Sequence, residues 1–122
     1  MAEEKPNLII KYLSPVVFSA ILSRDQTYIP KVNAGFWNSL KSGDIFTITD
    51  GERYCDVTVS GLFYFNNFGD AWFTLGDRMI PSHIQNIVTQ GDAIKYYRRY
   101  YHDQDVAVCG VVCIHVTPKN QL

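Results

Sequence analysis

The sequence predicts an α+β domain in which five or six mostly antiparallel strands form a small β-barrel with flanking helices. Residues 111–116 form an almost continuous β-branched run, which is typical of a strand buried on both faces. Asp50-Gly51 separates two segments of alternating hydrophobicity, 45–49 and 54–65, and is a strong hairpin signal. Helical patterns lie between these strands, and closure into a barrel would remove the exposed sheet edges.

The size and charge of the chain limit its organisation. Its 122 residues are 47% hydrophobic and 19% charged, which predicts one domain over residues 8–117 with flexible tails at 1–7 and 118–122. The net charge of −1 gives no general attraction to polyanions, so nucleic-acid binding requires a local patch. The acidic start and the lack of a long apolar run indicate neither a signal peptide nor a membrane partner. We therefore expect an intracellular protein, cytoplasmic or nuclear.

The first part of the chain predicts a strand, a helix and an edge strand. Residues 8–13 read as a short strand, and Ser14 and Pro15 read as the N-cap and first position of a helix. Residues 26–32 are rich in strand-forming residues but include Pro30, which cannot donate to a ladder. This second strand is therefore expected at an edge of the sheet or at a bulge.

The helices of the rest of the chain follow from apolar spacing. One helical turn is expected within 36–41 and a short helix or packed loop within 68–76, with a further helix holding Ile84, Ile87 and Val88. Residues 91–101 predict a helix that carries four tyrosines and three cations. Residues 102–108 read as a polar link to the last strand.

Cysteines and histidines give no metal or cofactor signal. If residues 109–113 are a strand, Cys109 and Cys113 lie roughly 13 Å apart, too far for a disulfide or a shared metal. We expect all three cysteines to be reduced packing residues, with a redox role for Cys55 as the alternative. The three histidines have no ligand spacing with one another or with the cysteines.

Several spaced motifs resemble the ASCH family, named for activating signal cointegrator homology. Together they span most of the chain: Thr27-x-x-x-Lys31, LKSGDIFTI at 40–48, the aromatic stretch YF-NNFGDAW at 64–72, the MIP turn at 79–81, and YYRRYY followed by GVVCIHV. The resemblance implies a barrel similar to the PUA RNA-binding domain. It also implies a cleft, lined by the segment after the first helix, that handles RNA or a modified nucleoside.

The cleft segment departs from the family's hydrolytic pattern. Some small bacterial members remove an acyl group from acetylated cytidine, and their segment resembles Lys-Thr-x-Thr-x-Arg or, in others, Lys-Thr-x-Glu-x-Arg. Here Gln26 and Ile29 stand where those members have Lys and the second Thr or Glu. A glutamine cannot take a proton and an isoleucine cannot attack an amide. We therefore expect binding without this hydrolysis, with Thr27 and Lys31 retained.

The resemblance and the residue types together define the candidate nucleic-acid-binding residues. They are Arg24, Gln26, Thr27, Tyr28, Lys31, Asn33, Trp37, Lys95 and Arg99.

Within this set, Lys31 is expected to anchor a phosphate or a carbonyl, Thr27 and Asn33 to hydrogen-bond a base, and Trp37 or Tyr28 to stack on it. The alternative interpretation of Lys31 is an ordinary solvated cation, and that of Trp37 is a residue of the core or its rim.

The tyrosine segment is a second candidate surface. Tyr96 and Tyr100, with Lys95 and Arg99 nearby, could stack the bases of a single strand. The alternative is that all four tyrosines pack the domain, with Tyr97 and Tyr101 facing the core.

Two other function classes remain open. One is an enzyme, an amidohydrolase or ribonuclease, whose acid-base groups would come from Asp44, Asp70, Asp77 or the tyrosines. The other is a protein-interaction module that keeps the barrel without its pocket, which the acidic pI of about 6.2 favours.

Overall fold

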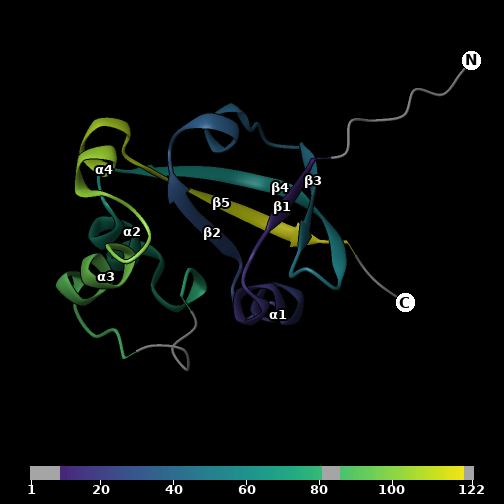
Figure 1. Cartoon of the computed structure of the whole chain (residues 1–122), viewed down its shortest axis with the longest axis horizontal. Coiled ribbons are helices and arrows are strands. Elements are labelled where there is room, and N and C mark those ends of the chain that lie inside the picture. The colour runs from purple at the N-terminus through teal and green to yellow at the C-terminus, as the bar shows by residue number, and fades with distance from the viewer. Residues whose placement is uncertain (1–8, 81–85, 120–122) are drawn as a thin grey trace, which may run out of the picture.

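A computed structural model describes residues 9–80 and 86–119 of the chain (Figure 1). Its elements follow in the order β1 (Ile10–Tyr12), α1 (Pro15–Ser23), β2 (Tyr28–Val32), the 3-10 helix η1 (Gly35–Ser39), β3 (Ile45–Thr49), β4 (Tyr54–Phe65), α2 (Phe68–Leu75), the 3-10 helix η2 (Gly76–Arg78), α3 (Gln90–Tyr97), α4 (Asp103–Cys109) and β5 (Val111–Pro118). Residues 1–7 and 120–122, where flexible tails are expected, lie outside the described residues.

The five strands form one mixed sheet, which confirms the α+β prediction. Their order is β1-β3-β4-β5-β2; β1 and β3 are parallel and the other pairs are antiparallel. The long strand β4 has an irregularity of register between Val59 and Gly61, and such bulges bend a strand. The sheet curls into a half-barrel whose two edge strands, β1 and β2, are not paired with each other.

Strand β5 holds the two layers of the core together, as its apolar run predicts. Val112, Ile114 and Val116 pack with α1, β3 and β4, whereas Val111 and Cys113 point to the other face and pack with α2 and α3. This alternation follows from the two-residue period of a strand. All five side chains are buried, so β5 is central, between β4 and β2.

Local signals near the chain's start and middle are confirmed. The Ser14 hydroxyl accepts a hydrogen bond from the Val17 N–H at 3.4 Å, and Pro15 begins α1. Asp50 and the residues after it connect β3 to β4, and the Asp50 carboxylate accepts from the Arg53 N–H at 2.8 Å. Helices α2, α3 and α4 gather at one end of the sheet, whereas α1 lies apart from them, below the sheet in the view of Figure 1.

The expected tyrosine helix of residues 91–101 is too long. Helix α3 ends at Tyr97, and the next turn tightens because the Arg99 and Tyr100 N–H groups donate to carbonyls three residues earlier. The expected polar link is itself a helix, α4, which also contains Cys109, so this residue does not share a strand with Cys113.

The predicted helix around Ile84 is not present in its described part. Ile84 lies outside the described residues, and Ile87 and Val88 are not helical. No helix of the described residues is long and apolar enough to cross a membrane.

Candidate functional site

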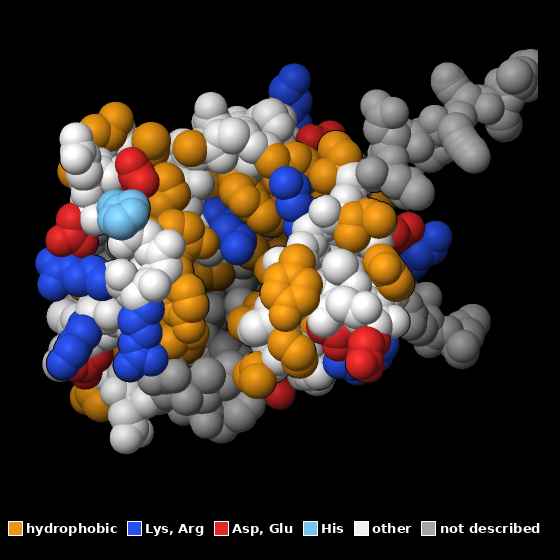
Figure 2. All heavy atoms as spheres, in the orientation of Figure 1, with side chains coloured by type: hydrophobic (Ala, Val, Ile, Leu, Met, Phe, Trp, Pro, Cys, Tyr) orange, Lys and Arg blue, Asp and Glu red, His pale blue; other side chains and the backbone are white. Residues whose placement is uncertain are grey.

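A cavity of about 310 Å³ opens where the half-barrel is not closed. It is lined by the end of β1 and start of α1, by β2 and Gln26 just upstream of it, and by the segments around Met79 and the α3 C-terminus. The lining residues are Tyr12, Leu13, Ser14, Val17, Gln26, Ile29, Pro30, Lys31, Met79, Ile80, Tyr96, Tyr97, Tyr100 and Tyr101. Figure 2 shows the molecular surface hollowed in its middle, with hydrophobic side chains on the walls and basic ones nearby.

The outer edge of β2 forms the floor of this cavity. The Val116 N–H donates to the Thr27 carbonyl, and this register makes Ile29 and Lys31 the residues bonded to β5 through their backbones. The backbone groups of Tyr28 and Pro30 therefore point away from β5. Pro30 has no N–H, so its carbonyl is the only ladder group that it can offer at this edge.

Gln26 closes one end of the cavity. Its side chain is only 2% exposed, and its Nε2 donates to the Tyr28 carbonyl at 2.8 Å. Since a carbonyl can only accept, this bond fixes the amide orientation and leaves Oε1 as an acceptor. Oε1 is buried and has no hydrogen-bond partner among the described residues. Such a buried, unpaired acceptor typically costs about 1–3 kcal/mol.

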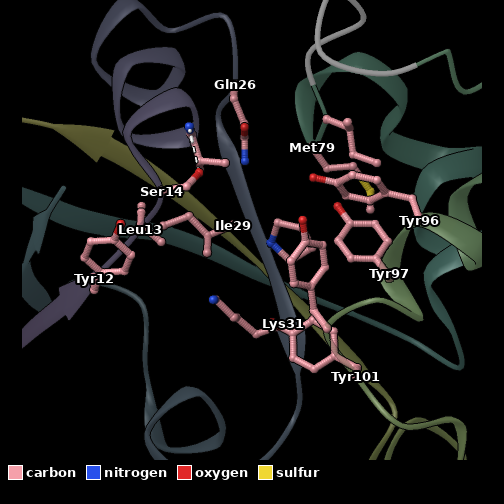
Figure 3. A pocket seen from close by; sticks show the side chains of 14 residues that line it. Tyr12, Leu13, Ser14, Gln26, Ile29, Lys31, Met79, Tyr96, Tyr97 and Tyr101 are labelled. Carbon is pink, nitrogen blue, oxygen red and sulfur yellow. Dashed lines mark hydrogen bonds between the residues drawn. The ribbon is translucent and has the colours of Figure 1, made fainter.

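Four tyrosines form the wall opposite β2 (Figure 3). The rings of Tyr96 and Tyr97 meet edge to face with centroids 4.9 Å apart, and Tyr96 and Tyr100 are 5.6 Å apart. Phe68 of α2 stacks on Tyr97 at 4.1 Å and on Tyr101 at 5.2 Å. Helix α2 thus holds two of the four rings in place.

The hydroxyls of Tyr96, Tyr97 and Tyr101 have raised pKa values. Burial raises the pKa of Tyr101 to about 12, and burial together with neighbouring groups raises the pKa of Tyr97 well above its ordinary value. Burial, followed by the influence of Tyr100, also raises the pKa of Tyr96. These groups can therefore both donate and accept hydrogen bonds in the cavity at neutral pH.

Lys31 is the cation that lines the cavity. Its Nζ lies 5.2 Å from the Trp37 ring centroid, within cation–π distance. Burial lowers the pKa of Lys31, and the positive charge of Lys11 lowers it further.

Among the candidate binding residues, Gln26 and Lys31 line the cavity and Trp37 touches Lys31 from outside it. Tyr28 is on the opposite face of β2, where it stacks on His115 at 4.8 Å and lies under the Arg78 guanidinium. It is thus a packing residue in this structure.

The other candidates also lie outside the cavity. The Arg24 guanidinium donates to the Pro118 carbonyl, and the Thr27 N–H donates to the Arg78 carbonyl. The buried Asn33 Oδ1 has no hydrogen-bond partner within residues 9–80 and 86–119, but Asn33 does not line the cavity. Lys95 is exposed on α3, and Arg99 lies over the Tyr96 ring at 5.9 Å.

Sequence reasoning missed the contribution of the segment before α1 and of Met79. Tyr12 and Leu13 reach the cavity because β1 is the other open edge of the sheet. The signal for Tyr97 and Tyr101 was present but was interpreted as core packing; both pack against Phe68 and also line the cavity.

The described residues contain no group of three or more His, Cys, Asp or Glu side chains that could hold a metal ion. Nor does any described carboxylate or imidazole line the cavity. The titratable side chains among its described lining residues are those of Lys31 and the tyrosines.

The half-barrel fold of this chain is similar to that of ASCH domains. The crystal structure of ASCH from Zymomonas mobilis superimposes with a TM-score of 0.60 and 12% identity, covering 89% of this chain and 68% of that one. The ASCH resemblance is thereby confirmed at the level of the fold, which is all that so low an identity shows.

Two solved structures that match over their whole length are also similar in fold to this chain. The hypothetical protein PH0355 matches with a TM-score of 0.80 and 19% identity over 93% of this chain and all of that one. PF0455 from Pyrococcus furiosus matches with a TM-score of 0.75 and 20% identity over 94% of this chain and all of its own. No family model and no curated protein matches the sequence.

Proposed function

We propose that the cavity binds one nucleoside unit, either a modified nucleoside or an unstacked residue of RNA. The observation that carries the proposal is the tyrosine wall facing Gln26 and Lys31 across about 310 Å³ (Figure 3). This volume lies at the lower end of the range for small-ligand sites and suits a single base with its sugar. RNA-binding proteins commonly stack single bases on aromatic rings in this way.

The polar groups complement a base in distinct ways. The unpaired Oε1 of Gln26 is an acceptor that suits the exocyclic amino group of a base. A ligand reaches this buried atom once the neighbouring side chains move aside. The phenol hydroxyls and the Pro30 carbonyl offer further hydrogen bonds along the walls. The ASCH fold supports a nucleic-acid ligand as an analogy only.

We propose binding rather than turnover, because Gln26 and Ile29 occupy the positions of the Lys and the Thr or Glu of the hydrolytic pattern. The lining residues also include no carboxylate or imidazole among those described. A depressed lysine pKa alone does not provide the nucleophile that amide hydrolysis requires.

An NMR titration of labelled protein tests this proposal. Cytidine, acetylated cytidine and a short single-stranded RNA are added separately, and we expect shifts at Gln26, Lys31, Tyr96 and Tyr101. Lys31→Met should abolish the binding seen at moderate salt, whereas the matched variant Lys41→Met, at an exposed loop position, should keep it. Absence of shifts at millimolar ligand would refute the proposal and favour a protein partner.

A further inference from the structure

A second lysine lies beside the cavity. Lys11, on the edge strand β1, places its Nζ 4.6 Å from the Phe36 ring centroid and 5.9 Å from that of Trp37. Lys31, on the opposite edge strand β2, lies 5.2 Å from the same Trp37 ring. The two ammonium groups thus converge on one indole from both sides of the open barrel.

Among the residues that the structure describes, this pair has no negative partner. The ion pairs of the described residues are Arg53 with Asp50 and Arg98 with Asp103, and neither lysine takes part in one. Two like charges that meet in a partly buried place are unfavourable unless an anion lies between them. The pKa of Lys31 reflects this, because the charge of Lys11 adds to burial in lowering it.

The aromatic rings hold the ammonium groups without using up all three of the N–H donors that each carries. A cation–π contact attracts the charge through the ring face, so the N–H donors remain available to a ligand. Lysine ammonium groups bind phosphate as compact point charges. The arrangement therefore favours a tetrahedral, multiply charged oxyanion at the end of the cavity nearest η1.

We propose that Lys11 and Lys31 together hold a phosphate group, so that the ligand of the cavity is a nucleotide rather than a free nucleoside. This inference rests on the proposed function and specifies its ligand class. The phosphate could belong to a free 5′-mononucleotide or to an RNA chain, and both sources present the same chemistry.

The test compares each of the four ribonucleosides with its 5′-monophosphate by calorimetry at low salt. For the base that binds, the monophosphate should bind about tenfold tighter or more, the usual size of a hydrogen bond to a charged group. Lys11→Met should reduce this preference towards one and leave the nucleoside affinity unchanged. Lys11→Arg should preserve it, and Lys41→Met is the matched surface control.

The outcomes separate the two proposals. Nucleoside binding with no preference for the monophosphate would overturn the phosphate inference alone, as would a preference that survives in Lys11→Met. Binding of the monophosphate without binding of the nucleoside would support the phosphate site and overturn the proposal that the cavity binds a nucleoside. Absence of binding by nucleosides, nucleotides and a short RNA would overturn both. A dinucleotide that binds tighter than the mononucleotide would identify an RNA chain as the source.

Discussion

At the scale of single residues, Lys31 combines a binding position with an unfavourable charge. Burial and Lys11 lower its pKa below the ordinary 10.5, so the unfolded chain binds the proton more tightly than the folded protein does. The charged lysine therefore opposes folding at neutral pH, and this opposition fades as the pH rises towards 10.5.

We expect Lys31→Met to raise the melting temperature at pH 7 by a few degrees while it abolishes ligand binding. The loss of a contact with Trp37 reduces the gain without cancelling it, because the methionine stem still packs on the ring. Melting curves between pH 7 and pH 10 measure this, and the gain should shrink as the pH rises. A lower melting temperature at pH 7 would show that the charge contributes to stability instead.

The raised pKa of Tyr101 leads us to expect a loss of folding stability at alkaline pH. Its pKa is about 12 in the folded protein and 10 in the unfolded chain, so folding keeps a proton that the unfolded chain releases. The contribution is complete below pH 10 and is lost as the pH rises to about 12, with a total of about 3 kcal/mol. Tyr101→Phe should flatten this decline in denaturant titrations at pH 9 to 12. Tyr54→Phe, at an exposed ring, should not.

At the scale of elements, the close approach of α2 and α3 positions the tyrosine wall. Gly69 of α2 has no side chain, and a Cβ there would meet the Ile94 Cδ1 of α3 at 2.9 Å and its Cγ1 at 3.1 Å. Any larger residue must push α3 away or force Ile94 into another rotamer. The glycine thus determines how near the tyrosines come to Phe68.

A pair of equal substitutions tests this packing. Gly69→Ala should destabilise the protein by about 1 kcal/mol, since overpacking exceeds the gain in helix propensity. Gly91→Ala, in α3, would place its Cβ 3.7 Å from the Thr89 hydroxyl, an ordinary contact, and should stabilise by about 0.5 kcal/mol. Urea titrations measure both. If both substitutions changed the free energy of unfolding in the same direction, the contact between α2 and α3 at Gly69 would not be tight.

The elements also show which sequence signals are reliable. Caps and hairpins are local, and so Ser14 and Asp50 predicted α1 and the β3–β4 connection. Helix α4 was missed because it is short and its apolar residues form one consecutive run, Val106 to Cys109, without helical spacing, although Asp103 and Asp105 suit a helix N-terminus. The tyrosine helix was extended too far because a pattern of spacing does not reveal where a turn tightens.

At the scale of the whole molecule, the cavity lies between two strands that do not pair. Ligand binding should therefore link β1 to β2 and protect both edges. At a ligand concentration of 100 times Kd, the gain in unfolding free energy is about 2.7 kcal/mol. Hydrogen exchange should slow at the amides of residues 10–13 and at those of residues 28, 29, 31 and 32. Slowing elsewhere alone would place the ligand at another surface.

The overall fold was predictable because its signals are strong and repeated, whereas the site depends on long-range geometry. The run at 111–116 predicted a central strand, and Pro30 predicted an edge strand, and both are confirmed. Nothing in the sequence indicated that Tyr28 would face His115, since the direction of a side chain on an edge strand depends on register. Lys11 was equally hidden, because it meets Trp37 only after β1 has joined the sheet.

The central position of β5 has a consequence for synthesis of the protein. Among the described strands, β2 pairs with β5 and with no other, although some 80 residues separate them in the chain. During translation β2 therefore remains unpaired at both of its edges until β5 has left the ribosome. Before that moment β2 is not held in the sheet and cannot form the floor of the cavity. A nascent chain that lacks β5 therefore cannot bind the ligand.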